Sequence, residues 1–164
     1  MGKTEPLEER LDRLASRAGD CLELYSSCAQ GTLLALQEEF GLGDARTLKA
    51  ATAMPGIAHR GETCGAVVGA LMALGLAFGR EKPDDYTALV KTIGSARRLC
   101  AGFEEEFGGC MCRDVQVHLF GRSFDLADPA EIIEFAKAGA AKKCRVPAEY
   151  AVRAAGRLII EGQL

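Results

Sequence analysis

Residues 63–79 read TCGAVVGALMALGLAFG, seventeen consecutive uncharged residues between Glu62 and Arg80. A segment that is apolar on every side is typical of a helix surrounded by other helices. A membrane span is the alternative, but seventeen residues lie at the lower limit for crossing a bilayer. No second hydrophobic segment accompanies the run. We therefore expect a buried central helix from about Glu62 to Phe78, and no membrane span.

One face of this predicted helix carries only small residues. Gly65, Gly69, Ala73 and Ala77 recur at intervals of four, so they lie on one side of a helix. Each glycine weakens an isolated helix by about 1 kcal/mol relative to alanine. Close packing of another backbone, or a group held between helices, must offset that loss.

The flanking sequence is also helical in pattern, because apolar residues recur every three or four positions without sustained alternation. Gly41 suits the end of one helix, Asp44 can cap the next, and Pro55 stops it. The sequence predicts an all-α fold, a compact multi-helix bundle around the Gly/Ala-rich helix, with a single domain over residues 1–164. The expected helices cover about residues 5–18, 20–40, 44–54, 62–78, 83–107, a short one from 114, 128–143 and one from 147, with a loop at 57–61.

Two of these helices have a predicted buried stripe. For residues 83–107 it comprises Tyr86, Leu89, Val90, Ile93, Cys100, Phe103 and Phe107, and for the last helix Tyr150, Val152, Ala155 and Ile159.

Charge and cysteine content limit the possible partners and compartment. Twenty basic and twenty-three acidic residues give a net charge of −3, which offers no excess positive charge for a nucleic acid. The first twenty residues contain no apolar signal region. We expect a cytoplasmic protein, in which seven cysteines are metal ligands, catalytic thiols or core residues rather than permanent disulfides.

Three cysteines lie where helix ends and basic neighbours would favour a thiolate. Cys64 falls in a predicted first helical turn, Cys112 precedes Arg113, and Cys144 lies between Lys143 and Arg145. The sequence thus predicts stabilised thiolates at these positions. Cys21 and Cys100 are expected to be inert core residues.

Cys110 and Cys112 are the only closely spaced pair. One intervening residue is too few for a zinc knuckle, and a disulfide across it would be strained and easily reduced. Covalent haem is excluded, because no C-x-x-C-H occurs. His59 is expected to be a solvated loop residue, with metal ligation as the alternative, and His118 to pack on the helix after Cys112.

Cys28-Ala29-Gln30, the run RGETCGAVVGALMALGLAFG, the turn at Cys112-Arg113-Asp114 and Cys144 together resemble the C_GCAxxG_C_C family of redox-active proteins. The resemblance covers roughly residues 20–144. It implies an all-helical redox protein of bacteria or archaea with four functional cysteines, Cys28, Cys64, Cys112 and Cys144. The motif element itself, Cys64 to Gly69, makes Gly65, Ala66 and Gly69 candidates for contact with a cofactor.

The resemblance also extends to a domain of split-Soret cytochromes, whose haem attachment sites this chain lacks. Cys21, Cys100 and Cys110 lie outside the four-cysteine pattern, and Cys110 is a candidate substitute or resolving thiol.

Two chemistries fit four converging cysteines. They could bind an iron–sulfur cluster or another thiolate-bound metal, or they could form a dithiol–disulfide relay with Cys64 as the attacking thiol and Cys110 or Cys112 as its partner. Either would make the protein an electron carrier or an oxidoreductase with an unidentified redox partner. The alternative is a non-catalytic helical scaffold or homodimeric subunit, joined through the Gly/Ala face, with buried and reduced cysteines.

Overall fold

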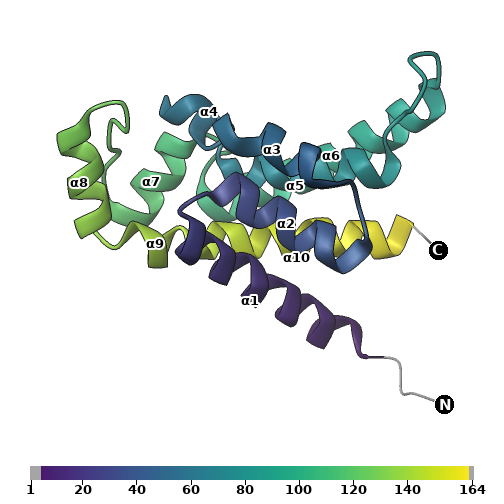
Figure 1. Cartoon of the computed structure of the whole chain (residues 1–164), viewed down its shortest axis with the longest axis horizontal. Helices are drawn as coiled ribbons and strands as arrows, with labels where there is room; N and C mark the ends of the chain where they lie inside the picture. Colours follow the sequence, from purple (N-terminus) through teal and green to yellow (C-terminus); the bar gives the residue numbers. More distant parts are fainter. Residues whose placement is uncertain (1–4, 163–164) are drawn as a thin grey trace.

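The computed structural model describes residues 5–162, and within this range the chain is helical, which confirms the all-α prediction (Figure 1). The only extended pairing in the described residues is an isolated antiparallel bridge between Thr63 and Met111. The single-domain prediction includes residues 1–4 and 163–164, which lie outside the described residues. The elements are α1 (Leu7–Tyr25), α2 (Cys28–Phe40), α3 (Ala45–Ala50), the 3-10 helix η1 (Ala51–Ala53), α4 (Gly56–His59), α5 (Gly65–Phe78), α6 (Tyr86–Phe107), α7 (Cys112–Phe120), α8 (Pro129–Lys137), α9 (Ala140–Lys143) and α10 (Arg145–Gly162).

The core lies where α1, α2, α5 and α10 pack together, and α6 adds to one side of it (Figure 1). Helix α5 contacts α2, α6 and α10, as its uniformly apolar sequence predicts. None of the helices within residues 5–162 is both long and apolar enough to cross a membrane. The fully buried side chains that fill the core include Leu11, Leu14, Leu33, Leu36, Val67, Leu74, Leu99, Phe103, Val152 and Ile159.

The small face of α5 packs against α2. A β-carbon on Gly69 would overlap the backbone oxygen of Ala29 and lie 3.1 Å from the nitrogen of Leu33. Only glycine allows two helices to approach this closely, which accounts for the residue despite its helix-weakening effect. Helix α2 of the same chain therefore covers the part of this face that Gly65 and Gly69 form.

The boundary between the first two helices differs from the prediction. Helix α1 continues to Tyr25, where the sequence analysis placed a break near residue 19. Ser26 takes a left-handed conformation, with φ of 53°, and the side chain of Ser27 caps α2 by accepting a hydrogen bond from the Gln30 amide. The paired serines end one helix and start the next, so Cys28 becomes the first residue of α2.

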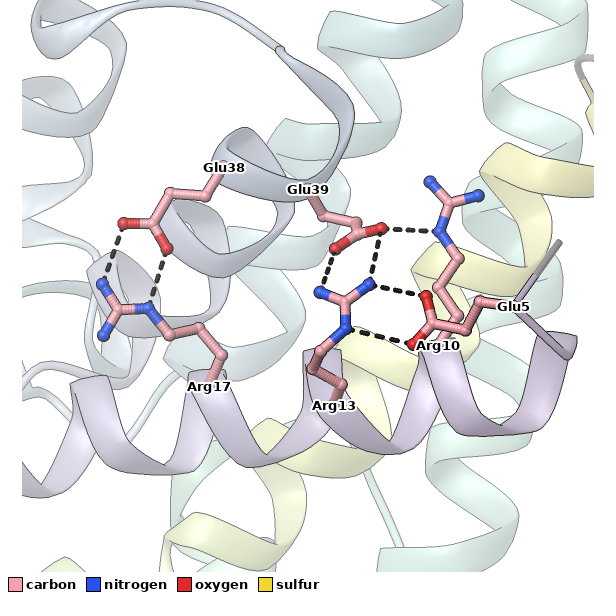
Figure 2. Close-up of polar contacts among 6 residues, drawn as sticks. All are labelled: Glu5, Arg10, Arg13, Arg17, Glu38 and Glu39. Carbon is pink, nitrogen blue, oxygen red and sulfur yellow. Dashed lines mark hydrogen bonds and ion pairs between the residues drawn. The ribbon is translucent and has the colours of Figure 1, made fainter. Parts of the chain in front are cut away.

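A network of ion pairs fastens α1 to the end of α2. Figure 2 shows Arg13 between Glu5 and Glu39, with Arg10 also donating to Glu39. A separate bidentate pair joins Arg17 and Glu38. These contacts hold the N-terminal helix across the α2 surface on the polar side of the apolar core.

Helix α6 differs from the prediction in where it begins and in which of its apolar residues are buried. It begins at Tyr86, with Asp85 as cap, not at Pro83. Phe103 and Phe107 are buried as expected, whereas Tyr86, Val90 and Ile93 are 69%, 71% and 43% exposed. These three residues lie in the first half of α6, whereas the buried phenylalanines lie in its last turns, so burial changes along the helix and the predicted continuous buried stripe was wrong.

The segment predicted as a loop at 57–61 contains a left-handed helical turn. Gly56, Ile57, Ala58 and His59 have φ values of 54°, 46°, 58° and 63°. Left-handed backbone costs an L-residue roughly 1–2 kcal/mol, so surrounding contacts must hold it. The His59 amide donates to the carbonyl of Pro55, and this turn lies directly before the bridge at Thr63.

The C-terminal third contains two further differences. Helix α7 begins at Cys112, two residues before the predicted start, and the predicted helix 128–143 is divided at Gly139, which has φ of 86°. Asp128 caps α8 as expected, but Glu131 accepts from Arg122 and the Asp125 amide and does not complete a capping box. In α10, Val152, Ala155 and Ile159 are buried, as predicted, and Tyr150 is half-buried.

Candidate redox centre

Four cysteines from distant parts of the sequence lie at helix starts. Cys28 is the first residue of α2, Cys64 caps α5, Cys112 is the first residue of α7, and Cys144 immediately precedes α10. The N-terminus of a helix carries unpaired N–H groups and the positive end of its dipole. We call these four residues the cysteine cluster.

The four thiols are close enough for their charges to affect one another. Ionisation of Cys64 is opposed by Cys28, Cys112 and Cys144, and Cys144 in turn interacts with Cys28 and Cys112. Cys64 is the most buried of the four, with 5% of its surface exposed. The structure therefore brings together the four cysteines that the sequence analysis grouped by resemblance.

Gly65 makes room for the sulfur atom of Cys28, and Gly56 lies at ordinary contact distance from that of Cys112. A β-carbon on Gly65 would overlap the Sγ atom of Cys28, and it would lie 3.0 Å from the backbone nitrogen of Ala29. A β-carbon on Gly56 would lie 3.5 Å from the Sγ atom of Cys112. Gly65, named as a cofactor contact from the motif, thus borders the cluster directly, whereas Gly69 serves the helix contact described above.

Backbone amides also face the sulfur atoms. The amides of Ala29 and Gly65 favour the ionised form of Cys28, and the amide of Ala66 favours that of Cys64. The motif residues Gly65 and Ala66 therefore contribute N–H groups at the start of α5. Such N–H···S contacts are a recognised means of tuning thiolate-bound redox centres.

The short antiparallel bridge joins the segment that contains Cys64 to the segment that contains Cys112, with Cys64 opposite Cys110. The amide of Cys64 donates to the carbonyl of Cys110 at 2.8 Å, and the amide of Cys112 donates to the carbonyl of Glu62 at 2.6 Å. These hydrogen bonds join the segment before α5 to the segment before α7. They fix two members of the cluster through the backbone, without relying on side-chain contacts.

Gln116 is a buried polar residue at the cluster that the sequence analysis missed. Its Nε2 atom donates to the Sγ atom of Cys112 at 3.5 Å, and its Oε1 atom accepts from the Phe124 amide at 2.7 Å. Only 1% of its surface is exposed. The signal available in the sequence was a polar residue four positions after Cys112, on the same face of the helix.

The prediction of stabilised thiolates was wrong. Burial raises the pKa of Cys28 to about 11 and that of Cys144 to about 12, and it holds the pKa of Cys64 well above its usual value. Burial also raises the pKa of Cys112, although the hydrogen bond from Gln116 lowers it. Desolvation of a charged thiolate outweighs the helix dipoles here.

The basic neighbours do not reverse this effect. Arg145, adjacent to Cys144, is occupied by carboxylates: its Nη1 atom lies 2.8 Å from both Asp20 and Glu23, and its Nε atom lies 2.5 Å from Glu149. A guanidinium that is paired in this way cannot also neutralise the adjacent thiolate.

The remaining candidates lie elsewhere. Cys21 is fully buried on α1, as predicted for a core thiol. Cys110 contacts Cys100 on α6, with its Sγ atom 3.8 Å from the Cys100 carbonyl, so Cys100 is not an isolated core residue. His59 is exposed, and His118 on α7 packs edge-on against Phe107 at 5.7 Å between ring centroids.

The donor set and the arrangement of the cysteine cluster determine which metal group it can hold. Four thiols, facing amides and glycine-lined space match the donor chemistry of an iron–sulfur site. Within residues 5–162, however, no three His, Cys, Asp or Glu side chains are arranged to hold a single metal ion. The donor set thus suits a thiolate-bound group, and the present spacing does not form a mononuclear site.

Comparison with known proteins agrees with this geometry. The family described as "Putative redox-active protein (C_GCAxxG_C_C)" matches residues 26–158. The chain belongs to this family. No curated protein and no solved structure matches the sequence.

Membership in the C_GCAxxG_C_C family confirms the resemblance seen in the sequence. The matched residues include all four members of the cysteine cluster, the whole of α2, α5 and α7, and most of α10. The family description writes glycine before the motif cysteine, whereas this chain has Cys64 before Gly65.

Proposed function

We propose that this C_GCAxxG_C_C protein is an electron-transfer protein or oxidoreductase whose cysteine cluster binds an iron–sulfur cluster. The proposal is carried by four thiols at four helix starts, of which Cys64 is buried and the other three are partly buried. Soft thiolate ligands select iron–sulfur clusters, and four of them complete the ligand set. When bound, such a group would accept and donate single electrons.

The electrostatics support an anionic group at this position. Four thiolates carry more negative charge than the iron and sulfide they hold can cancel, and helix N-termini favour negative charge. The thiols alone remain protonated because burial raises their pKa values, and metal binding displaces those protons. The residues of this chain would supply ligands, N–H donors and exclusion of water.

The number of cysteines favours a cluster over a dithiol–disulfide relay. A relay needs only two thiols, whereas four thiolates complete the ligand set of an iron–sulfur cluster.

Anaerobic reconstitution with ferrous iron and sulfide tests the proposal. We expect bound iron and sulfide in equal amounts, with visible absorption that dithionite bleaches. Cys64→Ser should lose most of this loading, and Cys21→Ser, which removes a core thiol outside the cluster, should keep it. Equal loading of the two variants, or no loading of the wild type, would overturn the proposal.

A dithiol–disulfide relay is the second candidate, and the lack of a preformed three-ligand group favours it. In that case metal-free protein would undergo reversible two-electron oxidation within the cluster, and Cys64→Ser would abolish it. Burial and raised pKa values also suit a scaffold or homodimeric subunit with reduced cysteines. Thiols that neither bind iron nor oxidise while the chain is folded would select the scaffold.

A reducing cytoplasm suits all three functions, because the seven cysteines are free. A redox partner must supply or remove the electrons in the first two.

A further inference from the structure

A second pair of thiols lies outside the cysteine cluster. Cys100 is on α6, and Cys110 follows the end of that helix, ten residues later. The thiol of Cys110 donates to the backbone carbonyl of Cys100 at 3.8 Å. Both residues are partly exposed, unlike Cys64.

The backbone explains why these two residues meet. Helix α6 ends at Gly108, whose φ of 79° reverses the chain. After this reversal the chain runs back past the last turns of α6, so that Cys110 lies near Cys100. Glu104, one helical turn after Cys100, interacts with both thiols. The contact is therefore built by the fold and does not depend on a flexible loop.

We propose that Cys100 and Cys110 form a second redox-active dithiol, which a small-molecule or protein disulfide oxidises to an intramolecular disulfide. In this exchange the two thiols lose two protons and two electrons, and one S–S bond forms between their Sγ atoms. The S–S bond of the oxidant breaks, and it is released as two thiols. This inference does not rest on the proposed function, because it requires no metal and no member of the cysteine cluster.

The pair is connected to the cluster through the backbone. The carbonyl of Cys110 accepts the hydrogen bond from the Cys64 amide, and Cys112 is two residues further on. A disulfide at Cys110 would link the segment around Met111, which forms the bridge with Thr63, covalently to α6. Oxidation of the pair would thus affect the backbone at the start of α5.

Glutathione disulfide is a suitable probe of the full-length, metal-free protein. After treatment, free thiols are alkylated in denaturant and the chain is cut after Met111 with cyanogen bromide and after Glu104, Glu105 and Glu106 with an endoproteinase. Cys100, Cys110 and Cys112 then lie on separate fragments. We expect the fragments with Cys100 and Cys110 to remain joined, with the mass of two hydrogen atoms lost, until dithiothreitol separates them.

Two variants make the result specific. Cys64→Ser should form the same linkage, which separates this inference from chemistry in the cluster. Cys100→Ser should lose it, with Cys110 recovered as a free thiol or as its glutathione adduct. Linkage of Cys110 to Cys112, or full alkylation of both Cys100 and Cys110 in the treated wild type, would overturn the inference.

Discussion

The Sγ atom of Cys28 occupies the space that a β-carbon on Gly65 would need. The side chain of Cys28, at the start of α2, therefore fits against the first turn of α5 only because Gly65 has no β-carbon. This contact lies within the cysteine cluster. This relationship explains why glycine follows Cys64 in this chain.

Gly65→Ala should displace Cys28 and disturb the cluster. We expect it to lower the free energy of unfolding by about 1–3 kcal/mol, the usual cost of overpacking, and to abolish iron loading. Urea unfolding and reconstitution would measure the two effects. Gly75→Ala is the matched control, because a β-carbon there meets no atom within 4 Å. It should stabilise α5 by up to about 1 kcal/mol and leave loading unchanged.

Gln116→Leu tests the buried amide beside Cys112. The substitution removes the donor to the Cys112 sulfur and leaves the Phe124 amide without its acceptor. An unsatisfied buried amide costs about 1–3 kcal/mol, so we expect a loss of that order in urea unfolding. Gln116→Glu should retain the acceptor for Phe124 and thereby recover part of the stability. If leucine at this position is neutral, the hydrogen bonds contribute nothing.

Alkaline pH should destabilise the metal-free protein through the cluster. The folded pKa of Cys144 is about 12, above the value of an exposed thiol, so the folded chain holds this proton more tightly than the unfolded chain does. Stability is therefore retained below about pH 8.5 and lost as pH rises toward 12. Urea unfolding of reduced protein at several pH values would measure this. Cys144→Ala should show a shallower decline, and identical slopes would contradict the assignment.

The ion pairs in Figure 2 should contribute unequally. The Glu39 side chain is 10% exposed and accepts from two arginines, whereas that of Glu38 is 46% exposed. Glu39→Gln should cost about 1.5–3 kcal/mol, and Glu38→Gln less than about 1 kcal/mol, because water screens the exposed pair. Thermal unfolding of both variants measures the difference. Equal losses of stability in the two variants would show that the burial of Glu39 does not strengthen its ion pairs.

Acid should act on the same network. Burial tends to raise the pKa of Glu39, but hydrogen bonds from Arg13 and Arg10 hold it below the usual value. A lowered folded pKa contributes stability at neutral pH that is lost as pH falls below about 4. Glu39→Gln should reduce this acid dependence, as followed by urea unfolding between pH 6 and pH 3.

Hydrophobic periodicity was sufficient to predict the central helix and its burial, because α5 is apolar on every side. It was insufficient for α6, where exposed Val90 and buried Phe103 are equally apolar and only the three-dimensional packing separates them. Local caps such as Asp44 and Asp128 were recognisable, since their function depends on neighbours in sequence.

The candidate site was partly predictable. The resemblance grouped the four cysteines, but the protonation state of Cys64 depends on burial by distant helices, which sequence spacing does not reveal. The contact between Cys100 and Cys110 likewise requires the chain reversal after α6, and the role of Gln116 requires knowledge of the Phe124 backbone position.

Cys28, Cys64, Cys112 and Cys144 are separated by 36, 48 and 32 residues along the chain. Anything that ligates all four would close three successive loops and restrict the entropy of the denatured ensemble. The bound group would then slow both unfolding under force and cleavage by proteases. The lifetime of the chain in the presence of a protease would measure how much of the group is bound. Loss of the group would make the chain easier to degrade.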